Sequence, residues 1–107
     1  MKTLVINDYT LTRGENAQEN WDMIDIAGPG WVWFHLNSFS SSHVIIKSDS
    51  PEDYAITAAS EWCKDSSKYK RVPNIKICYT KISNLQRGAK PGSVTFRSKK
   101  KVNYIKI

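Results

Sequence analysis

The segment Trp31–Lys47, with the sequence WVWFHLNSFSSSHVIIK, decides the fold of this 107-residue chain. Its first six residues alternate as a strand does, with Trp31, Trp33 and His35 on one face and Val32, Phe34 and Leu36 on the other. A polar link over residues 37–42 leads to a second strand at His43–Lys47. The unbroken apolar run Val44–Ile46 is typical of a strand with neighbours on both sides, so we expect it at the centre of a sheet.

Upstream of this segment the sequence predicts a hairpin followed by a helix. Two β-branched runs, Thr3–Ile6 and Tyr9–Thr12, flank Asn7-Asp8, a pair that favours a tight turn. Asn16 followed three residues later by Glu19 fits a capping box that opens a helix. Apolar residues then recur at helical spacing until Gly28-Pro29-Gly30 ends the element.

Downstream of the segment the sequence predicts a longer helix. We expect this helix over Pro51–Ser67, with Ser50 as its N-cap and Pro51 as its first residue. The stripe that faces the core is predicted to comprise Tyr54, Ala55, Ala58, Ala59, Trp62 and Cys63. The many alanines in this stripe indicate a close approach to a sheet.

Three further strands are expected after the second helix, and they complete the fold class. Ile75–Thr80 alternates as a strand, while Ser93–Arg97 and Val102–Ile107 are expected to form a closing hairpin around Lys99–Lys101. The order of elements predicts an α+β fold, with two helices and a mainly antiparallel or mixed sheet. A chain of this length builds one core, so residues 1–107 are expected to form a single small domain.

The chain is expected to reside in the cytoplasm. No apolar run approaches the roughly 20 residues that a membrane helix needs. The short apolar stretch after Met1 meets Asn7-Asp8 too soon to be a signal peptide.

Charge is segregated along the chain. Residues 1–63 hold three basic and nine acidic side chains, whereas residues 64–107 hold thirteen basic side chains and one acidic. A basic C-terminal half of this kind favours binding to a polyanion through counterion release. The alternative interpretation is a solvated, lysine-rich surface.

Few residues suggest catalytic or metal chemistry. His35 and His43 could serve as acid and base for RNA cleavage or as two metal ligands. No third ligand has suitable spacing, and no further catalytic motif accompanies them, so we expect no enzyme activity, metal or cofactor. Cys63 and Cys78 are too few for a disulfide framework and are predicted to be core residues.

The turn Arg87–Gly92 is the loop that most favours a phosphate ligand. Arg87 and Lys90 flank Gly88, so two cations project from a turn whose backbone amides are also available. Aromatic side chains can stack on unpaired bases, and Trp31, beside Gly30 at a strand start, is predicted to be the most exposed tryptophan.

Three stretches in order resemble a known family. They are Thr10–Asn20, Trp33–His35 followed by Ser41–Ile46, and Tyr79–Thr80 followed by Gly88–Val94. Together they are similar to the NFACT-R domain, a module of ribosome quality-control factors. The resemblance is to this domain in its stand-alone form. Its Gly-Arg-Asn element corresponds to Arg13, Gly14 and Asn16, with the first two in reversed order. Its Trp-x-His element corresponds to Trp33 and His35. Its Gly-Ser-His element corresponds to Ser41–His43, with serine in place of glycine, and its Gly-Ala-Lys-Pro-Gly element corresponds to Gly88–Gly92.

The resemblance implies a non-catalytic α+β domain that binds transfer RNA or ribosomal RNA in translation or ribosome-associated quality control. We expect His35, Ser42 and His43 to line a polar pocket beside Arg13, and basic side chains to contact phosphates. The expected nucleic-acid-binding residues are Arg13, His35, Ser42, His43, Lys68, Lys70, Arg71, Arg87, Lys90, Arg97, Lys99, Lys100 and Lys101. The rival hypotheses are a protein-interaction module that uses its basic face and a histidine-dependent RNA-processing enzyme. DNA is a variant ligand of the main hypothesis.

Overall fold

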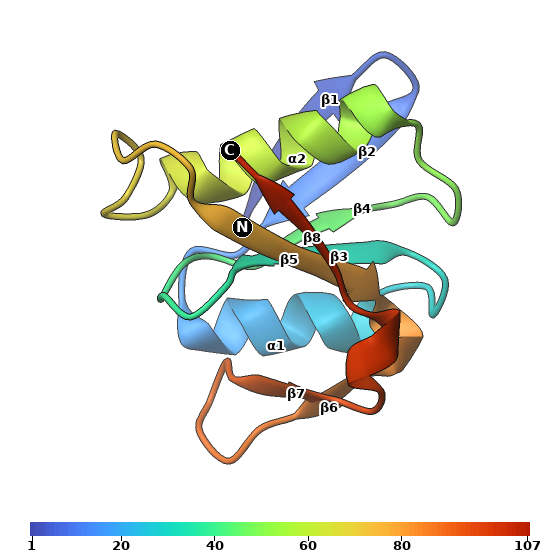
Figure 1. Cartoon of the computed structure of the whole chain (residues 1–107). Coiled ribbons are helices and arrows are strands. Elements are labelled where there is room, and N and C mark those ends of the chain that lie inside the picture. The colour runs from blue at the N-terminus through green and yellow to red at the C-terminus, as the bar shows by residue number, and fades with distance from the viewer.

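A computed structural model describes residues 1–107 and has an antiparallel six-stranded sheet at its centre (Figure 1). Its strands, in spatial order, are β1 (Lys2–Ile6), β2 (Tyr9–Arg13), β4 (Val44–Ile46), β3 (Val32–Leu36), β5 (Lys76–Lys81) and β8 (Asn103–Lys106). A separate ribbon pairs β6 (Leu85–Arg87) with β7 (Val94–Phe96). The helices are α1 (Ala17–Ile26) and α2 (Asp53–Asp65), with two short 3-10 turns at Ile82–Asn84 and Lys99–Lys101. The predicted α+β class and the interior position of β4 are confirmed.

Three layers enclose two apolar clusters. Figure 1 shows α2 on one side of the sheet, and α1 with the β6–β7 ribbon on the other. The alternation predicted for β3 is confirmed, because Val32, Phe34 and Leu36 join the cluster that includes the buried alanines of α2. Trp33 joins the second cluster, with Met23 of α1 and Leu85 of the ribbon. Neither helix is long and apolar enough to cross a membrane.

The predicted hairpin and first helix are confirmed in their local detail. The turn at Asn7-Asp8 joins β1 to β2, with Asn7 in the left-handed region at φ 51° and Ile6 paired with Tyr9. The backbone N–H of Glu19 donates to the side chain of Asn16 at 2.9 Å, so Asn16 is the N-cap of α1. The Glu19 carboxylate turns back to accept from the backbone N–H of Glu15 at 3.0 Å, one residue before the Asn16 N–H that the predicted capping box requires.

The second helix begins later than predicted. Helix α2 starts at Asp53, with Glu52 as the N-cap residue, so the assignments of Ser50 as N-cap and Pro51 as first helical residue are wrong. The physical reason is a tertiary contact: the backbone N–H of Glu52 donates to the hydroxyl of Tyr9 at 3.0 Å. A side chain of β2 thus binds the start of the helix. Tyr54, predicted to be buried, is exposed, and its ring meets that of Tyr9 edge-on.

The predicted closing hairpin does not form. Val94–Phe96 pairs with Leu85–Arg87, a strand that the sequence analysis missed, while β8 pairs with β5 at the sheet edge. Ile105 and Ile107 pack against the cluster beneath α2, whereas Val94 and Phe96 pack against the cluster beside α1. One predicted arm is therefore the edge strand of the main sheet and the other belongs to the separate ribbon, so they do not pair with each other.

Both cysteines are buried, as predicted, and are free thiols. Burial raises the pKa of the Cys63 thiol to about 12 and that of the Cys78 thiol to about 11. Each therefore stays protonated at neutral pH and packs as a small apolar side chain.

Candidate nucleic-acid interface

A polar hollow of about 540 Å³ opens where four segments meet. It lies between the start of α1, the loop that joins β3 to β4, the end of α2, and the turn before β7. The lining residues are Glu15, Asn16, Ala17, Asn20, His35, Ser40, Ser41, Ser42, His43, Ser66, Ser67, Lys68, Pro91, Gly92 and Ser93. Hydroxyl, amide and imidazole groups dominate this lining, so the hollow suits a ligand that forms hydrogen bonds.

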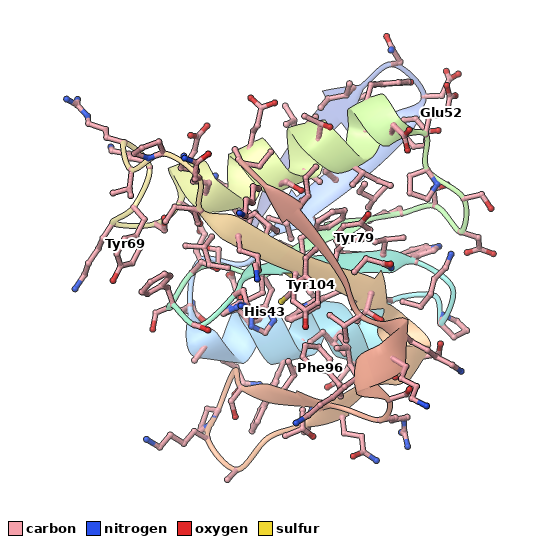
Figure 2. All side chains as sticks on the ribbon, viewed as in Figure 1. His43, Glu52, Tyr69, Tyr79, Phe96 and Tyr104 are labelled. Atoms are coloured by element: carbon pink, nitrogen blue, oxygen red, sulfur yellow. The ribbon has the colours of Figure 1, made fainter.

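Two histidines form the inner part of this lining. His43 is only 3% exposed, and Figure 2 shows it between the sheet and α1. Trp33 Nε1 donates to Nδ1 of His43 at 3.0 Å, and the His35 ring stacks parallel to the Trp33 indole. The two imidazole rings meet edge-on, with centroids 5.0 Å apart. Strand β3 and the start of β4 therefore position both rings.

Burial keeps both imidazoles neutral at physiological pH. It lowers the pKa of His43 to about 3, with a smaller contribution from the nearby His35. It also lowers the pKa of His35. Because His43 accepts at Nδ1, its proton lies on Nε2, whereas Nδ1 of His35 donates to the carbonyl of Leu36 at 2.7 Å. The pair thus provides one ring with a donor Nε2 and one ring with an acceptor Nε2.

Gly14 and Asn20 hold the backbone of His43. The N–H of Gly14 donates to the carbonyl of His43 at 3.1 Å, and the N–H of His43 donates to Oδ1 of the buried Asn20 at 3.3 Å. A Cβ on residue 14 would collide with that same Asn20 oxygen. Glycine at position 14 therefore allows Asn20 of α1 to reach the strand that carries His43.

The turn Gly88–Ser93 forms the outer wall of the hollow. The N–H of Gly88 donates to the carbonyl of Ser93 at 2.8 Å, and the Ser93 N–H donates to the carbonyl of Lys90 at 3.0 Å. Gly92 adopts φ +82° and lies directly against the first residue of α1, because a Cβ on Gly92 would lie 2.9 Å from the Ala17 Cα. The turn is thereby closed and seated against the helix.

Replacing Gly92 with alanine is expected to lower the free energy of unfolding by about 2 kcal/mol, from left-handed strain and from overpacking against Ala17. Chemical denaturation measures this change. The matched control is Ala89→Gly, on the same turn but exposed. A Gly92→Ala variant as stable as the wild type would contradict the contact between the turn and α1.

Four of the predicted basic residues lie on the loops that border the hollow. Lys68 lines it, and Lys70 and Arg71 are exposed on the same loop after α2. Lys90 is exposed on the turn that forms the outer wall. None of these four cations has an ion-pair partner among the salt bridges of the structure. They are therefore available to an anionic ligand.

Arg13 and Arg87 are each engaged within the fold. The guanidinium of Arg13 lies 4.7 Å from the ring centroid of Trp62, and its Nη1 donates to the Trp62 carbonyl at 3.2 Å. Arg13 does not line the hollow. The guanidinium of Arg87 lies 4.6 Å from the Trp21 ring centroid and pairs with Asp25. Both guanidinium groups therefore stabilise a half-buried tryptophan.

The remaining predicted cations form a second group. Figure 1 shows the turn at Lys99–Lys101 at the opposite end of the molecule from the loop after α2. Arg97 and Lys101 line a small polar pocket there together with Lys81, which the sequence analysis did not single out. The basic half of the sequence is thus divided between two regions of the surface.

Asn20 and Lys81 were not predicted as site residues, and Trp31, predicted as the most exposed tryptophan, has the same intermediate burial as Trp21 and Trp62. Asn20 carried a signal, since it ends the first stretch of the family resemblance, but nothing marks Lys81 within its alternating strand. Trp31 is partly buried and packs against the cluster beside α1. The structure contains no group of three or more histidine, cysteine, aspartate or glutamate side chains that could hold a metal ion.

Comparison with known families and proteins gives one consistent match. The family model described as NFACT protein RNA binding domain matches residues 3–98. The Rqc2 homolog RqcH of Bacillus subtilis is 32% identical over 103 residues, which cover 88% of this chain and 18% of that protein. Coiled-coil domain-containing protein 25 of Danio rerio is 29% identical over 108 residues, which cover 92% of this chain and 52% of that protein. The chain thus spans about half the length of these relatives or less.

A solved structure has the same fold. The C-terminal part of the fibronectin/fibrinogen-binding protein of Streptococcus suis superposes with a TM-score of 0.88 at 25% sequence identity. The match covers 98% of this chain and 43% of that one. The whole arrangement of layers described above therefore recurs in a related chain.

Proposed function

The chain belongs to the family of NFACT protein RNA-binding domains, and from this premise we propose that it binds RNA and catalyses no reaction on it. The proposed ligand is a transfer RNA or ribosomal RNA, bound mainly through its phosphates during ribosome-associated quality control in the cytoplasm. The likeness to RqcH, a homolog of Rqc2, supports the ribosomal context.

The observation that carries this proposal is the polar hollow between two basic loops. Lys68, Lys70 and Arg71 lie on one side and Lys90 lies on the other, without acidic partners. Phosphates of an RNA strand can bind these cations, while its ribose hydroxyls and bases form hydrogen bonds with serine and imidazole groups in the hollow. The 2′-hydroxyl is the group that distinguishes RNA from DNA at such a site.

The state of the histidines supports a binding role over cleavage. Acid–base cleavage of RNA by two histidines requires one imidazolium to protonate the leaving oxygen. With its pKa lowered to about 3, His43 holds almost no such proton at neutral pH. Burial lowers the pKa of His35 as well, so the pair is better suited to accepting and donating fixed hydrogen bonds.

The test is fluorescence anisotropy with labelled transfer RNA, in salt from about 50 to about 200 mM. The variant Lys68→Ala/Lys70→Ala/Lys90→Ala is expected to lose roughly tenfold to a hundredfold in affinity, and its slope of log K against log salt should fall by about 2 to 3. The matched control, Lys47→Ala/Lys76→Ala/Lys106→Ala, removes the same charge from exposed positions on other elements.

Two outcomes would contradict the proposal, and two others would favour its rivals. Failure of the wild type to bind any RNA near physiological salt would contradict RNA binding itself. Equal losses in the variant and the control would contradict the location, because only net charge would then matter. If the wild type shortens the labelled RNA and a His43→Ala variant does not, the enzyme hypothesis would be favoured. Weak salt dependence with tight binding to an acidic protein would favour the protein-interaction module.

A further inference from the structure

Two aromatic side chains meet on the two loops that border the polar hollow. Phe39 lies on the loop between β3 and β4, and Tyr69 lies on the loop after α2. Their ring centroids are 4.3 Å apart, with the ring planes tilted by 34°. Phe39 remains 41% exposed, although it is one of the largest apolar side chains in the protein. Figure 2 shows Tyr69 at the side of the molecule.

The pair is held in place from both sides. Tyr69 packs against the cluster beneath α2, and its N–H donates to Oγ of Ser67 at 3.1 Å. The loop that carries Phe39 is tied to α2, because the N–H of Ser42 donates to Oγ of Ser66 at 3.4 Å. Before Phe39, Ser38 adopts φ +69°, a left-handed turn that an L-residue adopts at a cost of about 1 kcal/mol. These contacts hold the pair in place and leave Phe39 exposed.

The neighbours of the pair have the chemistry of a nucleotide site. Ser40, next to Phe39, and Lys68, next to Tyr69, both line the hollow. Lys70 and Arg71 follow Tyr69 on the same exposed loop. An aromatic face beside cations and hydrogen-bonding groups is the arrangement that binds an unpaired base together with its phosphate.

We infer that Phe39 and Tyr69 form a platform on which one unpaired base of the bound RNA stacks, so that the chain selects single-stranded or looped RNA over a continuous duplex. The inference rests on the proposed RNA-binding function, and it adds the class of RNA. Bases inside a duplex are already stacked and paired, so they cannot reach Phe39, whereas their phosphates still reach the basic loops. The platform therefore contributes to affinity only for RNA that presents an unpaired base.

The test compares Phe39→Ala and wild type on two labelled RNAs of equal length, one single-stranded and one a continuous duplex. Phe39→Ala is expected to bind the single strand about tenfold more weakly, the effect of losing one stacked base, and to bind the duplex unchanged. Phe39→Trp should retain the affinity for the single strand, because it preserves an aromatic face. Tyr104→Ala, at an exposed tyrosine on β8, is the matched control and should leave both affinities unchanged.

A second readout reports on stacking directly. A 2-aminopurine in the single strand should lose fluorescence on binding to wild type and should keep it with Phe39→Ala. Circular dichroism checks that Phe39→Ala folds, as expected from a side chain that is already exposed.

The failures of the two proposals are distinguishable. Suppose that Phe39→Ala lowers the affinity for both RNAs equally, or for neither, while the triple lysine variant still loses RNA affinity. The stacking platform is then overturned, and the proposal of RNA binding stands. If the wild type binds no RNA, both proposals are overturned together.

Discussion

Replacing Asn84 with alanine is expected to lower the free energy of unfolding by about 3 kcal/mol, because it removes three hydrogen bonds from a buried polar network. Asn84 is 4% exposed. Its Nδ2 donates to Thr80 Oγ1 at 3.0 Å and to the Ser98 carbonyl at 2.9 Å, and its Oδ1 accepts from the Ser98 N–H at 2.9 Å. Truncation to alanine removes the hydrogen bonds that Asn84 forms with Thr80 and Ser98, and it opens a cavity beside β5.

The network also connects to the basic turn at Lys99–Lys101. Thr80 Oγ1 donates to the carbonyl of Lys101 at 2.9 Å, so Asn84 and Thr80 together hold both ends of the segment 98–101. Loss of Asn84 is therefore expected to loosen the segment, and hydrogen exchange should show faster exchange there than in α1.

Urea denaturation measures the change in stability for Asn84→Ala. The control is Asn103→Ala, at an exposed asparagine of β8 that takes part in no side-chain hydrogen bond of the network. If Asn84→Ala loses no more stability than this control, the buried network does not stabilise the fold.

The second large effect is a loss of stability in acid that originates at His43. Its pKa is about 3 in the folded protein and near 6.5 in the unfolded chain, so the unfolded state binds a proton that the folded state excludes. The free energy of unfolding therefore falls as pH drops below about 6.5, by about 1.4 kcal/mol per pH unit, and the fall continues towards pH 3. Between pH 7 and pH 4 this amounts to about 3 kcal/mol from His43 alone.

Denaturation curves at several pH values test this prediction. Carboxylates also titrate in acid, and the hydrogen bond from the terminal amine lowers the pKa of Glu19, so wild type must be compared with His43→Gln. Glutamine can accept from Trp33 Nε1 and does not titrate, so the variant should show a shallower dependence on pH. An NMR titration of the His43 ring in the wild type provides an independent measurement, and protonation near pH 6.5 would contradict the prediction.

The structure explains why the elements of the family resemblance lie so far apart in the sequence. Gly14 and Asn16, His35 and His43, and Gly92 come from three distant stretches, yet four of these five residues line the hollow and Gly14 supports it from behind. The last glycine of the Gly-Ala-Lys-Pro-Gly element is explained by the structure, because a side chain at position 92 would collide with Ala17 of α1. The resembling segments therefore correspond to one site.

Part of the candidate site was predictable because its signals are local. His35 and His43 were expected to share a polar pocket with Ser42, and all three line the hollow. Lys68 and Lys90 were expected as ligands of phosphate, and they lie on its two sides; their contacts with RNA stay a prediction. The engagement of Arg87 with Trp21 and Asp25 was not predictable, because the partners lie more than sixty positions away in the sequence.

Features that depend on neighbours along the chain were predictable from the amino-acid sequence. The Asn7-Asp8 turn, the Asn16 cap, the two faces of β3 and the burial of both cysteines follow from residues within a turn or a strand of one another. The pairing of distant segments and the exposure of each group to water depend instead on the three-dimensional fold. It placed Tyr9 at the start of α2, separated β7 from β8, divided the cations between two regions, and kept His43 neutral. The physical reason is that pairing and burial depend on which surfaces meet in three dimensions, and hydrogen bonding and charge then follow from that burial.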